Sequence, residues 1–288
     1  MPLNLTDSKV ALAGDWHHNA AWAESALRVI ADHGVHTVYH MGDFGIFPDV
    51  HGRDWYLERV HNICHKLDIT IYVTPGNHED WDWLSKRFAA SAALTPQSIP
   101  PSIAGQERLW VLPRGYRWTH AGRSLISLGG APSIDYEWRS TGRNWWIDET
   151  ISREVAQAVA EAGHAEIMFA HDAPNSSPVV QRALRRPTGY SAEALTYAAI
   201  GRSRIDAAIA GVRPMLYCHG HYHAPDESTL EDETRLLSLG QDGQAGNLVV
   251  LDLAADDFGV QWLDDPAAYP PVRRSLNPEH DYLARPEE

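Results

Sequence analysis

Five short polar segments carry side chains that bind divalent cations, and each follows an apolar run. They are Asp15-Trp16-His17, Gly42-Asp43, Gly76-Asn77-His78-Glu79, His171-Asp172 and His219-Gly220-His221-Tyr222-His223. Together they offer carboxylates, an amide and several imidazoles, which suit transition metals. This inventory favours a site for two cations about 3.5–4 Å apart, which would hold a phosphate and generate hydroxide.

Strand and helix patterns alternate around the first three segments. We expect strands at 9–13, 37–40 and 69–73, separated by helices at about 20–33 and 54–66, the first of them capped by Asn19. This order favours a parallel sheet with right-handed crossovers. Ligands of such sheets bind beyond the carboxyl ends of the strands. The polar segments therefore lie where a site is expected.

The rest of the chain has a less regular pattern. Residues 89–105 have a loop-like composition, and the Trp- and Arg-rich residues 129–148 form a second, longer loop of the kind that is often functional. We expect short antiparallel strands at 108–112, 115–119 and 124–128, helices at about 152–162 and 203–210, strands at 166–170 and 214–218, and a final antiparallel pair at 236–239 and 247–253.

Composition excludes several classes of function. The 288 residues include 22% charged residues, carry a formal net charge of −14 and show no basic stripe, so long nucleic acid is not the expected partner. The acidic balance is typical of a solvated surface. The sequence contains no run of about 18 apolar residues, so it predicts no membrane span. We expect a cytoplasmic protein with no membrane partner, in which Cys64 and Cys218 are buried free thiols.

The five motifs, in this order, resemble those of the calcineurin-like metallophosphoesterase superfamily, in its bacterial or phage-type members. The likeness covers residues 9–253, and Gly-Asn-His-Glu and Gly-His-x-His are its most specific parts. It implies an α/β fold, a four-layer α-β-β-α sandwich of two mixed sheets flanked by helices. We expect one domain over 1–265, with an active-site loop insertion at 129–148, and a C-terminal tail at 266–288.

The resemblance also implies a set of ligands for two divalent metal ions. Manganese is the first expectation, and iron, zinc and nickel are alternatives. Asp43 would bridge the ions and take part in catalysis, and the neighbouring His78 would contact phosphate and protonate the leaving oxygen. The first ion would be held by Asp15, His17, Asp43 and His223, and the second by Asp43, Asn77, His171 and His221.

Other residues have two explanations each. Arg139 and Arg143 could bind the substrate phosphate or form surface salt bridges, and His18 could face the substrate or orient a ligand. Glu79 and His219 are expected to orient ligands. Trp138, Trp145 and Trp146 are more typical of a packed loop anchor than of a base-stacking platform. Taken singly, Asp15, Asn77 and His171 also suit turn or core positions, whereas the metal hypothesis explains them jointly.

One departure from the superfamily narrows the function. Many members continue Gly-Asp as Gly-Asp-x-x-Asp-Arg-Gly, whereas this chain reads Gly42-Asp43-Phe44-Gly45-Ile46-Phe47-Pro48. We therefore expect hydrolysis of small phosphodiesters, such as cyclic nucleotides, or of phosphomonoesters, through a metal-bridging hydroxide. A nuclease of the same superfamily and a catalytically inactive scaffold are the alternatives. The sequence leaves the oligomeric state open.

Overall fold

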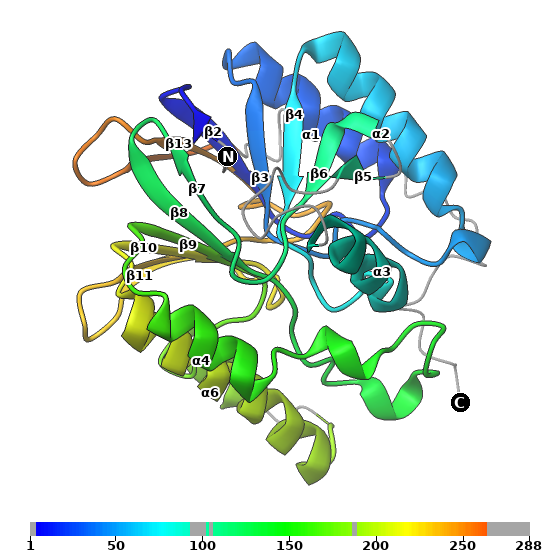
Figure 1. Ribbon diagram of the computed structural model, residues 1–288, viewed down its shortest axis with the longest axis vertical. Coiled ribbons are helices and arrows are strands. Elements are labelled where there is room, and N and C mark those ends of the chain that lie inside the picture. Colours follow the sequence, from blue (N-terminus) through cyan, green and yellow to red (C-terminus); the bar gives the residue numbers. More distant parts are fainter. Residues whose placement is uncertain (1–3, 93–101, 104–105, 186–188, 264–288) are drawn as a thin grey trace.

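Two seven-stranded mixed sheets form the centre of the protein, and helices cover their outer faces (Figure 1). A computed structural model describes residues 4–92, 102–103, 106–185 and 189–263. The first sheet has the strand order β14-β13-β2-β3-β4-β6-β5, and the second has the order β1-β7-β8-β9-β10-β12-β11.

The first sheet contains the three strands that precede the early polar segments. Strands β2, β3, β4 and β6 run parallel. Strand β13 pairs antiparallel with β2 and β14, and β5 pairs antiparallel with β6. Its strands are β2 (Lys9–Ala13), β3 (Thr37–His40), β4 (Thr70–Val73), β5 (Ser102–Ile103), β6 (Gln106–Val111), β13 (Leu248–Asp252) and β14 (Gly259–Trp262).

The second sheet contains the strands that precede the late polar segments. Here β8, β9, β10 and β12 are parallel, whereas β7 and β11 pair antiparallel with β8 and β12. Its strands are β1 (Asn4–Leu5), β7 (Arg117–His120), β8 (Arg123–Leu128), β9 (Ile167–Ala170), β10 (Leu216–His219), β11 (Asp226–Thr229) and β12 (Arg235–Ser238).

Helices α1 and α2 pack on the first sheet, and α4 and α6 pack on the second. The predicted cap of α1 is confirmed, because Asn19 Oδ1 accepts a hydrogen bond from the backbone N–H of Trp22 at 3.1 Å. The helices are α1 (Ala20–Asp32), α2 (Arg53–Leu67), α3 (Trp81–Ala92), α4 (Arg153–Glu161), α5 (Pro178–Leu184) and α6 (Ala192–Val212), with 3-10 turns η1 (Asp49–His51), η2 (Tyr136–Trp138) and η3 (Ile147–Glu149).

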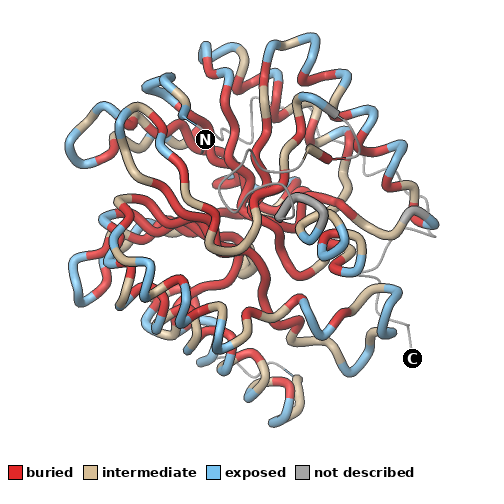
Figure 2. Tube along the Cα trace, in the orientation of Figure 1, coloured by how far each residue is buried: buried red, intermediate tan, exposed pale blue. Residues whose placement is uncertain are grey.

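Alternation along the strands builds three apolar layers. In β2, Val10 and Leu12 face the core between the sheets, whereas Ala11 and Ala13 face α1 and α2. In β9, Met168 and Ala170 face α4 and α6. The buried strands therefore run through the middle of the molecule (Figure 2). The four-layer sandwich that the family resemblance implies is confirmed.

The structure corrects two strand pairings. Strand β6 lies in the first sheet, parallel to β4, and only β7 and β8 form the expected hairpin. Strands β12 and β13 do not pair with each other, because β12 joins β10 and β11 while β13 joins β2 and β14. Alternating apolar residues identify the faces of a strand but not its neighbour.

Two helices also differ from the predictions. Helix α6 begins at Ala192 and not near residue 203, since Ser191 caps it by accepting the backbone N–H of Ala194. Helix α3 extends to Ala92, into the segment expected to be a loop, and the rest of that segment up to residue 105 is described only at β5. The predicted tail at 266–288 lies outside the described residues.

Two smaller expectations concern the thiols and the membrane. Cys64 and Cys218 are buried free thiols, as predicted. Among the described residues, no helix combines the length and the apolar character needed to cross a membrane.

Candidate metal centre

The carboxyl ends of strands from both sheets bring the five polar segments together. Asp15 and His17 follow β2, Asp43 follows β3 and Asn77 follows β4, while His171 and the His221–His223 segment follow β9 and β10. The backbone N–H of His17 donates to Asp43 O at 2.8 Å, and that of His221 donates to Asp15 Oδ2 at 3.0 Å. The first bond joins two loops of the first sheet, and the second joins a loop of the second sheet to one of the first.

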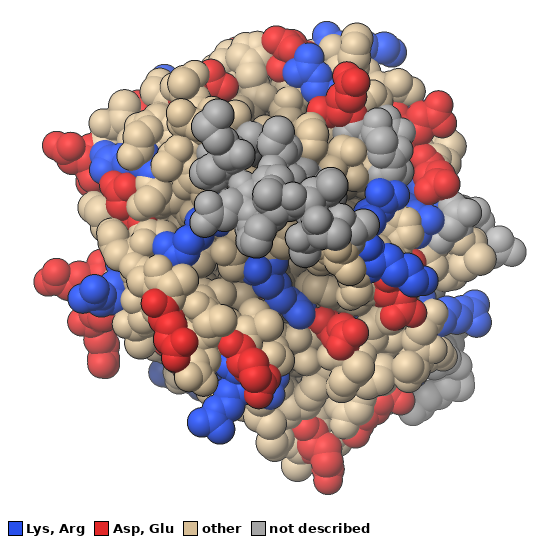
Figure 3. Space-filling model, in the orientation of Figure 1, with Lys and Arg blue, Asp and Glu red and all other residues tan. Residues whose placement is uncertain are grey.

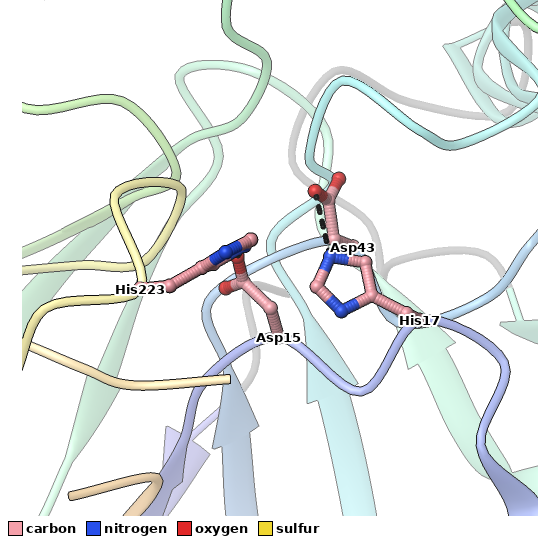
Figure 4. Close-up of side chains that lie close together, drawn as sticks. All are labelled: Asp15, His17, Asp43 and His223. Atoms are coloured by element: carbon pink, nitrogen blue, oxygen red, sulfur yellow. Dashed lines mark ion pairs between the residues drawn. The ribbon is translucent and has the colours of Figure 1, made fainter. Parts of the chain in front are cut away.

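One cluster, called site 1 below, consists of Asp15, His17, Asp43 and His223. Each residue offers one ligand atom, and these atoms lie within 4.8 Å of one another. His223 Nε2 is 2.9 Å from Asp15 Oδ2, and His17 Nε2 is 3.7 Å from Asp43 Oδ2. Figure 4 shows the four side chains turned toward one another.

A second cluster, called site 2 below, consists of Asp43, Asn77, His171 and His221. The ligand atoms of its carboxylate and two imidazoles also lie within 4.8 Å of one another. Asn77 joins them, because its Oδ1 is 3.0 Å from His171 Nε2, which is 3.4 Å from Asp43 Oδ2. Asp43 belongs to both clusters, which is the arrangement required of a bridging carboxylate.

The backbone at these residues is unusual. His17, Asp43, His221 and His223 all have positive φ angles, between 45° and 66°. Left-handed conformation costs a non-glycine residue roughly 1–2 kcal/mol, and such strain concentrates at functional sites. Four of the seven clustered residues therefore hold a conformation that the fold must impose.

Glycines allow the loops to approach closely. A Cβ at Gly76 would collide with Asp43 Oδ1, and a Cβ at Gly220 would collide with Asp15 Oδ1. The glycine that precedes the ligand in each of these motifs thus makes room for the carboxylate of another motif.

Site 1 is supported by a residue that the sequence analysis missed. Asp242 Oδ1 lies 3.0 Å from His17 Nδ1, and its Oδ2 accepts a hydrogen bond from Asn19 Nδ2 at 2.7 Å. A carboxylate on the far nitrogen of a metal-binding imidazole fixes the ring and its tautomer. Asp242 lies beyond the carboxyl end of β12, so the strand-end criterion that found the other residues applies to it as well.

Glu79 connects the backbones of the two central loops. Its buried carboxylate accepts hydrogen bonds from the backbone N–H groups of Asp43, Gly45 and Gly76. Burial, and then the charge of Asp43, raise its pKa to about 7. Glu79 thereby holds Asp43 next to the loop that carries Asn77, as the orienting role predicted for it requires.

Site 2 depends on different partners. His171 Nδ1 lies 2.6 Å from the backbone oxygen of Met41. Asn77 Nδ2 donates to Ser133 Oγ at 3.0 Å, and Ser133 Oγ donates to Glu149 Oε2 at 2.9 Å. Burial raises the pKa of Glu149 to about 8, although bonds from Ser133 and the charge of Arg139 oppose the shift.

The electrostatics of the clusters favour added positive charge. Burial alone would lower the pKa of His17, but hydrogen bonds to Asp242 and Asp43 and the charges of Asp43 and Asp15 raise it to about 10. The pKa of His171 is likewise raised to about 10 against burial, chiefly by Asp43. The protein alone would compensate its buried carboxylates with protons, and divalent cations would do so with these imidazoles as neutral ligands. The donor set therefore fits two such ions.

A family model decides the classification of this chain. The model described as calcineurin-like phosphoesterase matches residues 8–225. The chain belongs to the calcineurin-like phosphoesterase family. Enzymes of this family generally hydrolyse phosphoester bonds and typically use two divalent metals. The resemblance recognised in the motifs is thus confirmed.

Solved structures agree with this family fold. Protein TT1561 of Thermus thermophilus is 13% identical, with a TM-score of 0.55, over 90% of this chain and 100% of that chain. A dimetal phosphatase from Danio rerio is also 13% identical, with a TM-score of 0.51, over 85% and 92% of the two chains. At this identity the likeness shows the fold alone. No curated protein matches the sequence.

His78, the non-ligand histidine expected of the family, lies against both clusters. Its backbone N–H donates to Asp43 Oδ1 at 2.9 Å, and its Nε2 is 3.8 Å from Asp43 Oδ2. Arg139 from the loop approaches the same ring, with Nη2 3.0 Å from His78 Nε2. Burial and the charge of Arg139 lower the pKa of His78 well below its ordinary value. The imidazole is therefore neutral beside the guanidinium.

The residues predicted to bind substrate belong to neither cluster. Arg143 is exposed, whereas Arg139 also pairs with Asp135 at 2.7 Å and is nearly buried. The ring of His18 stacks on Phe47 and Tyr56, at centroid distances of 5.4 and 4.5 Å, and its Nε2 is 3.1 Å from Gly52 O. Their roles in substrate binding stay predictions.

The tryptophans of the loop divide into two groups. Trp146 is buried in the apolar layer next to α1 and α2, as a loop anchor would be, and Trp145 lies 5.8 Å from the ring of Tyr136. Trp138 is 69% exposed, with its ring 5.5 Å from that of Tyr190.

Proposed function

We propose that this protein is a two-metal hydrolase of small phosphate esters, acting on phosphodiesters of the cyclic-nucleotide kind, on phosphomonoesters, or on both. The observation that carries the proposal is the pair of ligand clusters that share Asp43. Site 1 and site 2 would each hold one ion, with manganese the first candidate. When bound, two such ions neutralise phosphate charge and activate water for in-line attack.

His78 is assigned the proton transfer. It touches Asp43 but belongs to neither cluster, so its ring is not committed to a metal ion. In the proposed reaction Nε2 of His78 first takes up a proton and then donates it to the leaving oxygen as the ester bond breaks, which returns the ring to neutral imidazole.

Arg139 is assigned the phosphate contact. Many family members have an Asp-Arg pair shortly after Gly-Asp. This chain lacks the pair, and Phe44 and Ile46 of the corresponding segment are buried in the core. Arg139 supplies a guanidinium beside His78 from a different segment. A phosphoryl oxygen would compete for its N–H groups and release Nε2 of His78 for the proton transfer.

Charge supports a small substrate. On the face drawn in Figure 3, acidic and basic side chains alternate with uncharged ones, and the net charge of the whole chain is −14. A nuclease that neutralises many phosphates would need a basic groove. The net charge of the chain thus favours small esters over long nucleic acid.

Substrate panels on the manganese-loaded protein test this function. We expect hydrolysis of p-nitrophenyl phosphate or bis(p-nitrophenyl) phosphate, and of cyclic or linear mononucleotides. The matched control is Asp43→Asn prepared in the same way, which should be inactive. Preferential cleavage of long single- or double-stranded DNA would support the nuclease instead. Absence of both bound metal and hydrolysis would support a scaffold.

A further inference from the structure

Three buried side chains connect the loop at 129–149 to the amide of site 2. Asn77, Ser133 and Glu149 are 2%, 1% and 0% exposed. Asn77 Nδ2 donates to Ser133 Oγ at 3.0 Å, and Ser133 Oγ donates to Glu149 Oε2 at 2.9 Å. The second oxygen of Glu149 accepts the backbone N–H of Ser133 at 2.6 Å. The carboxylate thus holds both polar groups of this serine.

This hydrogen-bond order determines which way the amide of Asn77 faces. An amide has one oxygen, which can bind a metal, and one NH₂ group, which cannot. At a pH above its raised pKa, the carboxylate of Glu149 is ionised and only accepts. The hydroxyl hydrogen of Ser133 then points to Glu149, and only lone pairs are left for Asn77. The NH₂ group must then face Ser133, and Oδ1 faces His171 Nε2 in site 2.

Glu149 is itself held in place by a helix of the second sheet's outer layer. Tyr197 of α6 donates its hydroxyl to Glu149 Oε1 at 3.3 Å. Ser133 follows the carboxyl end of β8, so this hydrogen-bonded chain runs from α6 through the loop to the strand-end motif of the first sheet.

We propose that Ser133 and Glu149 are positioning residues that hold the oxygen of Asn77 toward site 2, and thereby set the metal affinity of site 2 but not of site 1. The inference rests on the proposed two-metal function. It gives the loop at 129–149 a task besides presenting Arg139, namely to orient an amide that could otherwise rotate its oxygen away.

Calorimetric titration of the full chain with Mn²⁺ alone tests this inference, at a pH above the raised pKa of Glu149. The wild type should bind two ions. Ser133→Ala should lower the affinity for one ion by about 10–100-fold, the usual effect of losing a partner that orients a ligand. The affinity for the other ion should stay unchanged. Glu149→Gln keeps the side-chain shape and should lower the affinity for the same ion. This variant tests the inference if Ser133→Ala does not fold.

The chain offers a matched control for these substitutions. Ser124 donates its backbone N–H and its hydroxyl to Glu166, at 2.8 and 3.1 Å. This pair has the same chemistry but lies at the amino end of β8, away from the clusters. Ser124→Ala should leave both manganese affinities unchanged.

A double-mutant cycle separates orientation from general packing. Asn77→Asp replaces the amide by a carboxylate with two equivalent oxygens, so orientation no longer matters. In that background Ser133→Ala should change the affinity of the second ion by less than about twofold. An equal loss in both backgrounds, or no loss in the wild-type background, would overturn the inference. A wild type that binds no Mn²⁺ would overturn the proposed function as well.

Discussion

The two halves of the candidate centre are supported in different ways. In site 1, Asp242 touches His17 directly, and both follow strands of the central sheets. In site 2, the partners of His171 and Asn77 are a backbone carbonyl and a neutral hydroxyl, and a carboxylate enters only through Ser133. In site 1 a carboxylate thus contacts a ligand directly. In site 2 a serine of the loop orients a ligand amide through a hydrogen bond.

The same contrast separates the sheets from the loop insertion. The strand ends supply all seven clustered side chains. Residues 129–149, which are the insertion and the residue that follows it, supply Ser133, Arg139 and Glu149, which contact the Gly-Asn-His-Glu motif or one another. We infer that the strands define how many ions bind, whereas residues 129–149 adjust the binding of one ion and the surroundings of His78.

The largest effect is expected at Asp43, the residue that both halves share. Asp43→Asn should remove the bridging carboxylate and lower metal content at both sites. Because two bound ions contribute several kcal/mol to catalysis, activity should fall by at least about 10³-fold. Metal analysis and kcat on an aryl phosphate check this. Retention of two ions with full activity would show that the halves do not share a ligand.

Replacing His78 should lower catalysis without changing metal binding at site 1 or site 2. His78→Ala should lower kcat by about 10²–10⁴-fold, the usual contribution of a general acid, while metal content stays at the wild-type value. The deficit should shrink for esters with a good leaving group such as p-nitrophenolate, since these need no protonation. Loss of metal in this variant would make His78 a ligand.

Asp242 tests the direct support of site 1. Asp242→Asn keeps the shape of the side chain but removes the charge that faces His17, and we expect the affinity of one ion to fall by about 10–100-fold. Calorimetry should show the other ion unchanged. A loss confined to the ion that Ser133→Ala also weakens would contradict the division into two separately supported halves.

The smallest effect is expected at Arg139. Arg139→Gln should raise KM by about tenfold, the loss of one charge-assisted hydrogen bond, and leave both metal affinities unchanged. Arg143→Gln is the comparison on the same loop, because Arg143 is exposed. Its KM should rise less, since only Arg139 contacts His78. If the two variants behave alike, Arg139 does not contact the phosphate.

Much of this arrangement could be predicted from the sequence. The strands before Asp15 and Asp43 are apolar runs with clear ends, and the parallel order of β2, β3 and β4 follows from the intervening helices. The clustered residues were found because carboxyl ends of parallel strands meet at one edge. Only the family resemblance implied that both sheets contribute ligands to the metal centre.

The parts that could not be predicted depend on contacts distant in the sequence. Asp242 meets His17 across 225 positions, and Ser133 meets Asn77 across 56. No local pattern marks such a pairing, since Ser133 resembles any polar residue of a turn. The pairing of β6 with β4 was missed for the same reason.

Anomalous scattering from crystals soaked in Mn²⁺ tests the central claim most directly. Two peaks about 3.5–4 Å apart are expected, with Asp43 between them, His17 and His223 at one, and His171 and His221 at the other. A single peak, or peaks away from Asp43, would contradict the shared-carboxylate centre.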